Sequence, residues 1–138
     1  MTLVVDASVA VKWVVAEEGR AEALQRAAGE ELIAPDFVVT ESANILWKKV
    51  RLGQLDHQQA QEGLSFISGA FTRLFPTRQL ISRALTLAVE LDHPVYDCIY
   101  LACSEVEGSE FLTADRRLAN KAAGRPGLQV TMLGGLAS

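Results

Sequence analysis

Four acidic residues stand in apolar parts of the sequence, where an ionised side chain is rarely placed without a partner. Asp6 follows the apolar run LVV, and Asp115 follows the run FLT. Asp97 comes directly before CIYLAC, and Glu41 lies between apolar residues at helical spacing. Most other acids have polar neighbours, and we expect them on solvated helix faces. These four carboxylates are therefore the candidates for chemistry.

A cluster of such carboxylates would need compensation for its charge. Two carboxylates about 5 Å apart repel by roughly 3 kcal/mol at an effective dielectric constant of about 20. Without a cation, some of them must therefore take up protons. Hard oxygen ligands suit Mg²⁺ or Mn²⁺, which lower the pKa of a bound water and neutralise charge on a leaving oxygen. If the four acids meet, the sequence indicates phosphodiester chemistry.

A structural role for three of these acids must be weighed against the chemical one. Aspartate is a favoured N-cap, so Asp6, Asp97 and Asp115 could each serve only to begin a helix. Glu41 has no place at a helix start, so capping does not account for the whole set.

The elements that must position these acids alternate along the 138 residues. Short apolar runs at 2–5, 32–34, 74–75, 111–113 and 130–133 predict strands. Helices are expected from residue 8, over 19–28, 37–52, 57–68 and 77–91, and from residues 97 and 115. This alternation predicts an α/β fold with one domain over residues 1–138. A mostly parallel sheet of about five strands would lie between two helical layers, with about seven helices in total.

The expected sheet would bring the four acids to one edge. Ligands of open α/β sheets bind beyond the carboxyl ends of the strands. Asp6 and Asp115 follow two strands, Asp97 begins a helix that faces the same edge, and Glu41 can reach it from a flanking helix. We therefore expect one acidic pocket.

Composition narrows the class of protein further. Thirteen Lys and Arg residues against seventeen Asp and Glu give a net charge of −4, which excludes a generally basic nucleic-acid binder but allows a local basic patch. No apolar run reaches about 18 residues, and Asp6 and Lys12 interrupt any signal peptide, so we expect a cytoplasmic protein without a membrane segment. Cys98 and Cys103 are expected as buried thiols, and His57 and His93 offer no recognisable zinc spacing.

Four segments resemble, in order, the motifs of the PIN-domain ribonucleases: VVDASV, PDFVVTESAN, VYDCIYLACSE and FLTADRRLA. The sequence looks most like the VapC-type toxins of toxin–antitoxin (VapBC) pairs, and the resemblance covers about residues 3–133. One such segment is weak alone, but four in this order in a chain of this length are specific.

The resemblance implies a Mg²⁺-dependent endoribonuclease, with Mn²⁺ able to substitute, and a catalytic, metal-binding set of Asp6, Glu41, Asp97 and Asp115. Asp6 and Asp97 would be the principal ligands, Asp115 would bind directly or through water, and Glu41 would bind through water or orient the attacking water. The supporting residues are expected to be Ser8, Thr113 and Asn44. Some relatives carry a further acid where this chain reads LAN at 118–120, so a single-metal mechanism is expected.

The resemblance also implies partners. RNA would be held by basic residues near the acids, for which the candidates are Arg116, Arg117, Lys121 and Lys48. A VapB-type antitoxin and a second copy of the chain would cover apolar side chains of the first four helices. Trp13 and Trp47 are candidate anchors there, although core packing accounts for each equally well.

Two other functions fit parts of the pattern. A catalytically silent PIN-fold binding module is an alternative, but the complete acidic set argues against it. A Mg²⁺-dependent phosphatase or phosphoacceptor domain also places Asp after its first strand. The phosphatase needs a second Asp where this chain has Ser8, and the phosphoacceptor needs paired acids where it has only Asp6.

Overall fold

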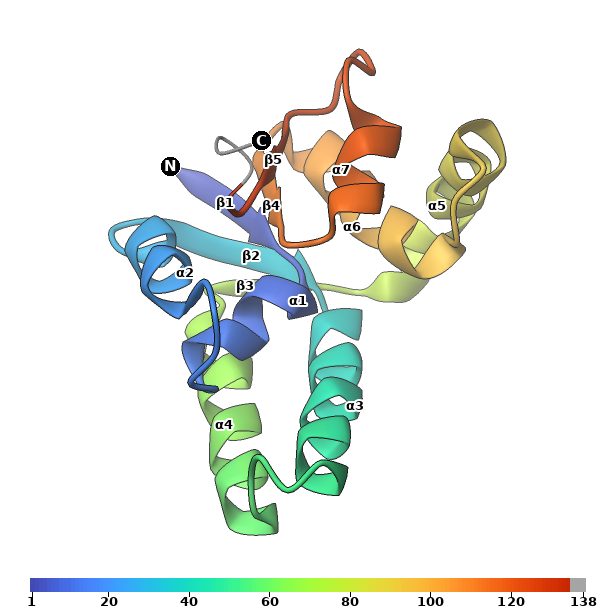
Figure 1. Ribbon diagram of the computed structural model, residues 1–138. Coiled ribbons are helices and arrows are strands. Elements are labelled where there is room, and N and C mark those ends of the chain that lie inside the picture. The colour runs from blue at the N-terminus through green and yellow to red at the C-terminus, as the bar shows by residue number, and fades with distance from the viewer. Residues whose placement is uncertain (135–138) are drawn as a thin grey trace.

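The computed structural model describes residues 1–134, and its centre is one sheet of five parallel strands in the order β3-β2-β1-β4-β5 (Figure 1). The strands are β1 (Thr2–Val5), β2 (Glu31–Pro35), β3 (Arg73–Phe75), β4 (Glu110–Thr113) and β5 (Val130–Met132). The predicted parallel sheet is confirmed.

Helices cover both faces of this sheet. They are α1 (Ala7–Ala10), the 3₁₀ turn η1 (Val11–Trp13), α2 (Arg20–Ala27), α3 (Phe37–Arg51), α4 (His57–Ala70), α5 (Thr77–Leu91), α6 (Val95–Glu107) and α7 (Arg116–Ala122). The chain moves outward from β1 in one direction through α1–α4 and returns in the other through α5–α7. Right-handed crossovers therefore place the first group on one face and the second on the other, as Figure 1 shows. None of the described helices is both long and apolar enough to cross a membrane.

The central strand explains why the first acid lies at the sheet edge. Leu3, Val4 and Val5 are buried because strands and helix layers enclose β1 on every side. Val5 lies opposite Leu112 of β4, so the next residues of the two segments also come together. The next residue after Val5 is Asp6.

Two helices differ from the sequence-based expectation, the first in its length and the sixth in its start. The first helix is only one turn long before the chain tightens into η1. The sixth begins at Val95 rather than Asp97, because the fixed φ of Pro94 (−56°) suits the residue that precedes a first helical turn. The prediction that Asp97 begins this helix is therefore wrong: it is the third residue of α6, and Pro94 is the N-cap.

Candidate metal and nuclease site

Asp6 lies between two hydroxyl groups at the carboxyl end of β1. Ser8 Oγ donates to its Oδ1 at 2.6 Å, and Thr113 Oγ1 donates to its Oδ2 at 2.5 Å. The backbone N–H of Val9 also donates to Oδ1, at 3.2 Å, so Asp6 is the N-cap of α1 as well. The carboxylate is 4% exposed, and its orientation is fixed from both sides.

The same hydroxyls connect Asp6 to the loop after β4. Ser8 Oγ accepts from the N–H of Ala114 at 3.1 Å, and Thr113 Oγ1 accepts from the N–H of Asp115 at 3.0 Å. Asp115 in turn caps α7, since its Oδ1 accepts from the N–H of Leu118 at 3.1 Å. The carboxyl ends of β1 and β4 are thus joined by a continuous set of hydrogen bonds.

Glu41 reaches the site from the second turn of α3 and is held there by Tyr100. The Tyr100 hydroxyl donates to Glu41 Oε1 at 2.6 Å. Tyr100 is buried, and its ring stacks on Phe111 of β4 with centroids 5.8 Å apart and planes 1° apart. Packing of the ring in the core therefore fixes the position of a carboxylate at the edge of the sheet.

Asp97 is paired with a buried histidine. His93 Nε2 and Asp97 Oδ2 are 2.7 Å apart, whereas His93 Nδ1 is buried without a partner in the described chain. One ligand atom each of His93, Asp97 and Asp115 lies within 4.8 Å of the others, which is a spacing that can hold a metal ion.

Two of the carboxyls have raised pKa values because they are buried, and the charges of neighbouring acids add to the rise. Burial raises the pKa of Asp6 to about 7, and the charge of Glu41 adds to this against the hydrogen bonds from Ser8 and Thr113. Burial also raises the pKa of Glu41, helped by the charges of Asp97 and Asp115 and opposed by Tyr100. No basic side chain is among the groups that shift these two values. All four acids therefore share one electrostatic environment.

The capping alternative accounts for only part of this arrangement. Asp6 and Asp115 are N-caps, and each also belongs to the cluster. Asp97 and Glu41 are not caps. Capping and membership of the cluster are therefore compatible, because a parallel sheet places its strand ends and the following helix starts at the same edge.

The other predicted residues lie at different distances from this cluster. Ser8 and Thr113 are within it, whereas Asn44 is exposed on α3, one turn beyond Glu41. Arg116 and Arg117 are exposed in the first turn of α7. With Asn120 and Lys121 they line a shallow surface pocket. Lys121 also donates to the carbonyl of Asp92 at 3.1 Å. Lys48 is exposed on α3, about 10 Å along the helix axis from Glu41.

Sequence analysis missed two residues of the cluster. The spacing of His93 does not match a zinc site, so the sequence offered no reason to include it. Its position four residues before Asp97, near the start of the same helix, was the signal that could have found it. Tyr100 read as an ordinary core residue of an apolar helix. Its partner Glu41 is 59 positions away, so no local pattern points to it.

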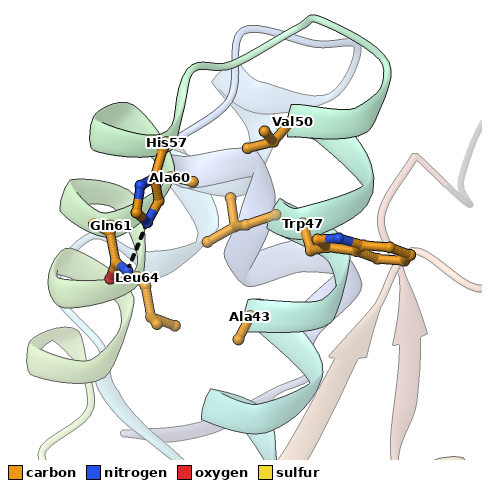
Figure 2. A pocket seen from close by; sticks show the side chains of 8 residues that line it. Ala43, Trp47, Val50, His57, Ala60, Gln61 and Leu64 are labelled. Carbon is orange, nitrogen blue, oxygen red and sulfur yellow. Dashed lines mark hydrogen bonds between the residues drawn. The ribbon is translucent and has the colours of Figure 1, made fainter.

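The helical layers carry exposed apolar side chains on three surfaces. The first is a pocket between α3 and α4 (Figure 2), where Trp47 is 51% exposed and a hydrogen bond of 3.2 Å joins Gln61 to His57. The second is a groove formed by η1, α2 and α4, lined by Val14, Leu24, Leu55 and Phe66 among others. The third, which sequence analysis did not predict, is a stripe on α5 made by Ile81, Leu85 and Val89. Trp13 packs in the core and is 4% exposed, although it also lines the groove.

Comparison with known proteins agrees with this geometry. The PIN domain family matches residues 3–124. Ribonuclease VapC3 of Pyrobaculum aerophilum is 38% identical over 125 residues, which cover 88% of this chain and 95% of the relative. The crystal structure of PAE2754 from the same organism has a TM-score of 0.74 at 27% identity, covering 99% of this chain and 95% of that one. VapBC2 from Rickettsia felis, solved bound to a DNA fragment from its promoter, contains a chain with a TM-score of 0.67 at 12% identity; the match covers 96% of this chain and 98% of that one.

The chain belongs to the PIN domain family, among its VapC-type members. The resemblance found in the four sequence segments is thereby confirmed for the fold and the family. The roles of individual residues stay predictions.

Proposed function

We propose that this protein is a divalent-metal-dependent endoribonuclease, the toxin of a toxin–antitoxin pair, that cleaves RNA with a metal-activated water. One observation carries the proposal: four carboxylates from four separate elements meet at one edge of the sheet, and those of Asp6 and Glu41 have raised pKa values. The name of the relative Ribonuclease VapC3 supports the same activity.

The residues present fit Mg²⁺, with Mn²⁺ as its substitute. Asp97 and Asp115, whose spacing suits an ion, would hold it together with Asp6, whose carboxylate is kept in one orientation by Ser8 and Thr113. Bound there, the ion would lower the pKa of a water and offset the negative charge on the phosphate. A divalent cation would also lower the pKa of Glu41, which burial raises and the charges of Asp97 and Asp115 raise further.

Glu41 would orient the attacking water. Its Oε1 is occupied by the Tyr100 hydroxyl, which leaves Oε2 to accept a hydrogen bond from the water and then its proton. Because Tyr100 is fixed by stacking on Phe111, the carboxylate keeps one orientation. Asn44, exposed one turn further along α3, is proposed only to contact bound RNA.

Arg116 and Arg117 would hold the RNA backbone beside the cleaved bond. Both are exposed directly after Asp115, and Lys121 lines the same pocket. Lys48 would contact phosphates further from the acids. Replacing Arg117 with Gln should lower affinity for all RNA sequences alike and reduce the slope of log K against log salt by about one.

The groove of η1, α2 and α4 is the proposed site for a VapB-type antitoxin segment. It is a depression lined by apolar side chains together with Arg20, Gln59 and Glu62. In it, Leu24 is 43% and Phe66 57% exposed. The similarity to a chain of VapBC2 supports an antitoxin as partner, and the exposed apolar side chains of the groove are the reason to place it there. A homodimer would cover one of the other two apolar surfaces, and a cytoplasmic location suits a substrate made of RNA.

Cleavage of a mixed RNA pool by the purified protein tests the nuclease. We expect cuts with Mg²⁺ and with Mn²⁺ and none with EDTA. Asp97→Asn, which keeps the shape of the side chain and removes its charge, should lower the rate by at least about 100-fold. Asp56→Asn is the matched control, because it removes one carboxylate at the N-cap of α4, where Asn caps equally well. A folded, metal-binding wild-type protein that cuts no RNA would instead support the binding-module alternative.

A further inference from the structure

Helices α3 and α6 lie on opposite faces of the sheet, and their N-terminal turns contact each other beside the acidic cluster through two matching pairs of side chains. Phe37 and Glu41 lie one turn apart on α3, and Tyr96 and Tyr100 lie one turn apart on α6. The inner pair is the hydrogen bond from Tyr100 to Glu41. The outer pair is Phe37 and Tyr96, whose rings stack with centroids 5.8 Å apart and planes 16° apart.

The inner pair holds Glu41 in place, whereas the outer pair leaves the ring of Tyr96 open to solvent. Tyr96 is 65% exposed although it is a large aromatic side chain in the first turn of the most buried helix. Its ring is nevertheless held in place, since Phe37 supports one face and itself contacts Tyr100, with centroids 6.4 Å apart. The result is an aromatic ring of fixed orientation that exposes much of its surface to solvent.

The position of this ring relates it to the proposed nuclease site. Tyr96 directly precedes Asp97, and one helical turn, about 6 Å, separates its level from that of Tyr100 and Glu41. Arg116 and Arg117 follow Asp115, on another side of the same cluster. A ligand with its phosphate at the carboxylates could therefore place an adjoining flat group on Tyr96.

From this geometry we infer that Tyr96, supported by Phe37, is a stacking platform for an unpaired nucleobase next to the cleaved phosphodiester bond. The inference rests on the proposed function and makes the substrate single-stranded at that nucleotide. Bases that are free of a duplex stack on exposed aromatic side chains in RNA-binding proteins generally. A second protein is the poorer occupant, because an apolar surface seated on Tyr96 would also remove water from the adjoining Asp97.

Cleavage of a short single-stranded RNA of randomised sequence, with Mg²⁺ present, is the first test. Alanine substitution of a base-stacking residue weakens binding by roughly 5- to 100-fold, so Tyr96→Ala should lower kcat/KM by about that factor. Tyr96→Phe keeps the ring and should restore most of the kcat/KM that Tyr96→Ala loses. Val106→Ala is the matched control, because Val106 is equally exposed, 65%, near the other end of α6.

Abasic substitution identifies the stacked base. A synthetic RNA spanning a wild-type cut is prepared with one base removed at each position near the cut. At one position, removing the base should reduce cleavage by the wild type. It should not reduce cleavage by Tyr96→Ala further, because that variant has already lost the stacking interaction. Equal losses at every position in both proteins would overturn the platform, as would a Tyr96→Ala variant that cleaves normally. If the wild type cuts no RNA, the proposed function fails and the platform with it; if only the Tyr96 results fail, the nuclease stands.

Discussion

The acidic cluster and the apolar surfaces of the helical layers place side chains in opposite kinds of unfavourable surroundings. At the sheet edge, carboxylates are removed from water, and burial raises the pKa of Asp6 to about 7. On the helices, Trp47, Phe66 and Leu85 are more than half exposed to water. The first region lacks positive charge, and the second lacks a covering surface.

The two regions also differ in how firmly their side chains are held. Asp6 and Glu41 have hydrogen-bond partners that fix specific oxygens, so the cluster has its shape before anything binds. Trp47 is 51% exposed, and the guanidinium of Arg51 lies over its ring, 5.1 Å from the centroid. A small ion needs preset ligands, whereas a protein partner can rearrange exposed side chains as it binds.

The largest effect is expected when a substitution removes the charge of Asp6. Its carboxyl has a pKa of about 7 in the folded chain, against an ordinary value of 3.8, so the metal-free folded state loses stability as pH rises from about 4 to 7. Asp6→Asn should therefore make the metal-free protein more stable above pH 7, by at most about 4 kcal/mol, and change little near pH 4. Urea unfolding in EDTA at both pH values measures this. Mg²⁺ should stabilise the wild type above pH 7 and the variant much less; equal stabilisation of both would contradict a charge cluster that needs a cation.

The next effect concerns the apolar surfaces. A two-fold dimer buries one self-complementary patch, so among Trp47→Ser and Leu85→Ser only one variant should lower the dimer fraction, by the equivalent of about 2 kcal/mol if that residue is an anchor. Phe66→Ser should leave the dimer intact, because its groove is proposed for the antitoxin. Sedimentation velocity over a range of concentrations distinguishes the variants. A wild type that sediments as a monomer of 15.0 kDa at every concentration would refute the dimer.

A smaller effect is expected when the Tyr100 hydroxyl is removed. Its hydrogen bond opposes the rise in the pKa of Glu41, so Tyr100→Phe should raise that pKa further. The acid limb of the cleavage rate against pH should move to higher pH, while the rate on the plateau falls by about tenfold or less. An unchanged acid limb with a lower rate at every pH would mean that Tyr100 acts only through packing.

The smallest effect tests a buried polar group outside both regions. Ser42 Oγ is buried in α3 without a hydrogen-bond partner among the described residues. Ser42→Ala removes a hydroxyl that lost its hydration without compensation, so it should stabilise the protein by up to about 1 kcal/mol. Thermal unfolding measures the change, and a loss of stability would show that the hydroxyl has a partner.

The fold was predictable because local and long-range preferences agree in most elements. The apolar runs of β1 and β4 can only be buried strands, and the predicted helix at 77–91 has the bounds of α5. The apolar residues after Asp97 predict a helix that starts at Asp97, whereas in the structure Pro94 sets the start.

The site was predictable in its acids but not in their partners. The sequence indicates three of the acids by their position next to strands and helix starts: Asp6, Asp97 and Asp115. Tyr100 could not be found, because its ring packs like any core residue and only the tertiary structure brings Glu41 to its hydroxyl. Likewise, periodicity shows that α5 has apolar faces, but it does not reveal which face, with Ile81 and Leu85, stays uncovered.

The two hydroxyls beside Asp6 have a further consequence. Ser8 and Thr113 each donate to the carboxylate and accept from a backbone amide, those of Ala114 and Asp115. Any change in the charge on Asp6 alters the polarity of these hydroxyls and so of the amides behind them. The ¹⁵N–¹H resonances of Ala114 and Asp115 are therefore built-in reporters of the state of Asp6, and they make ion binding visible residue by residue.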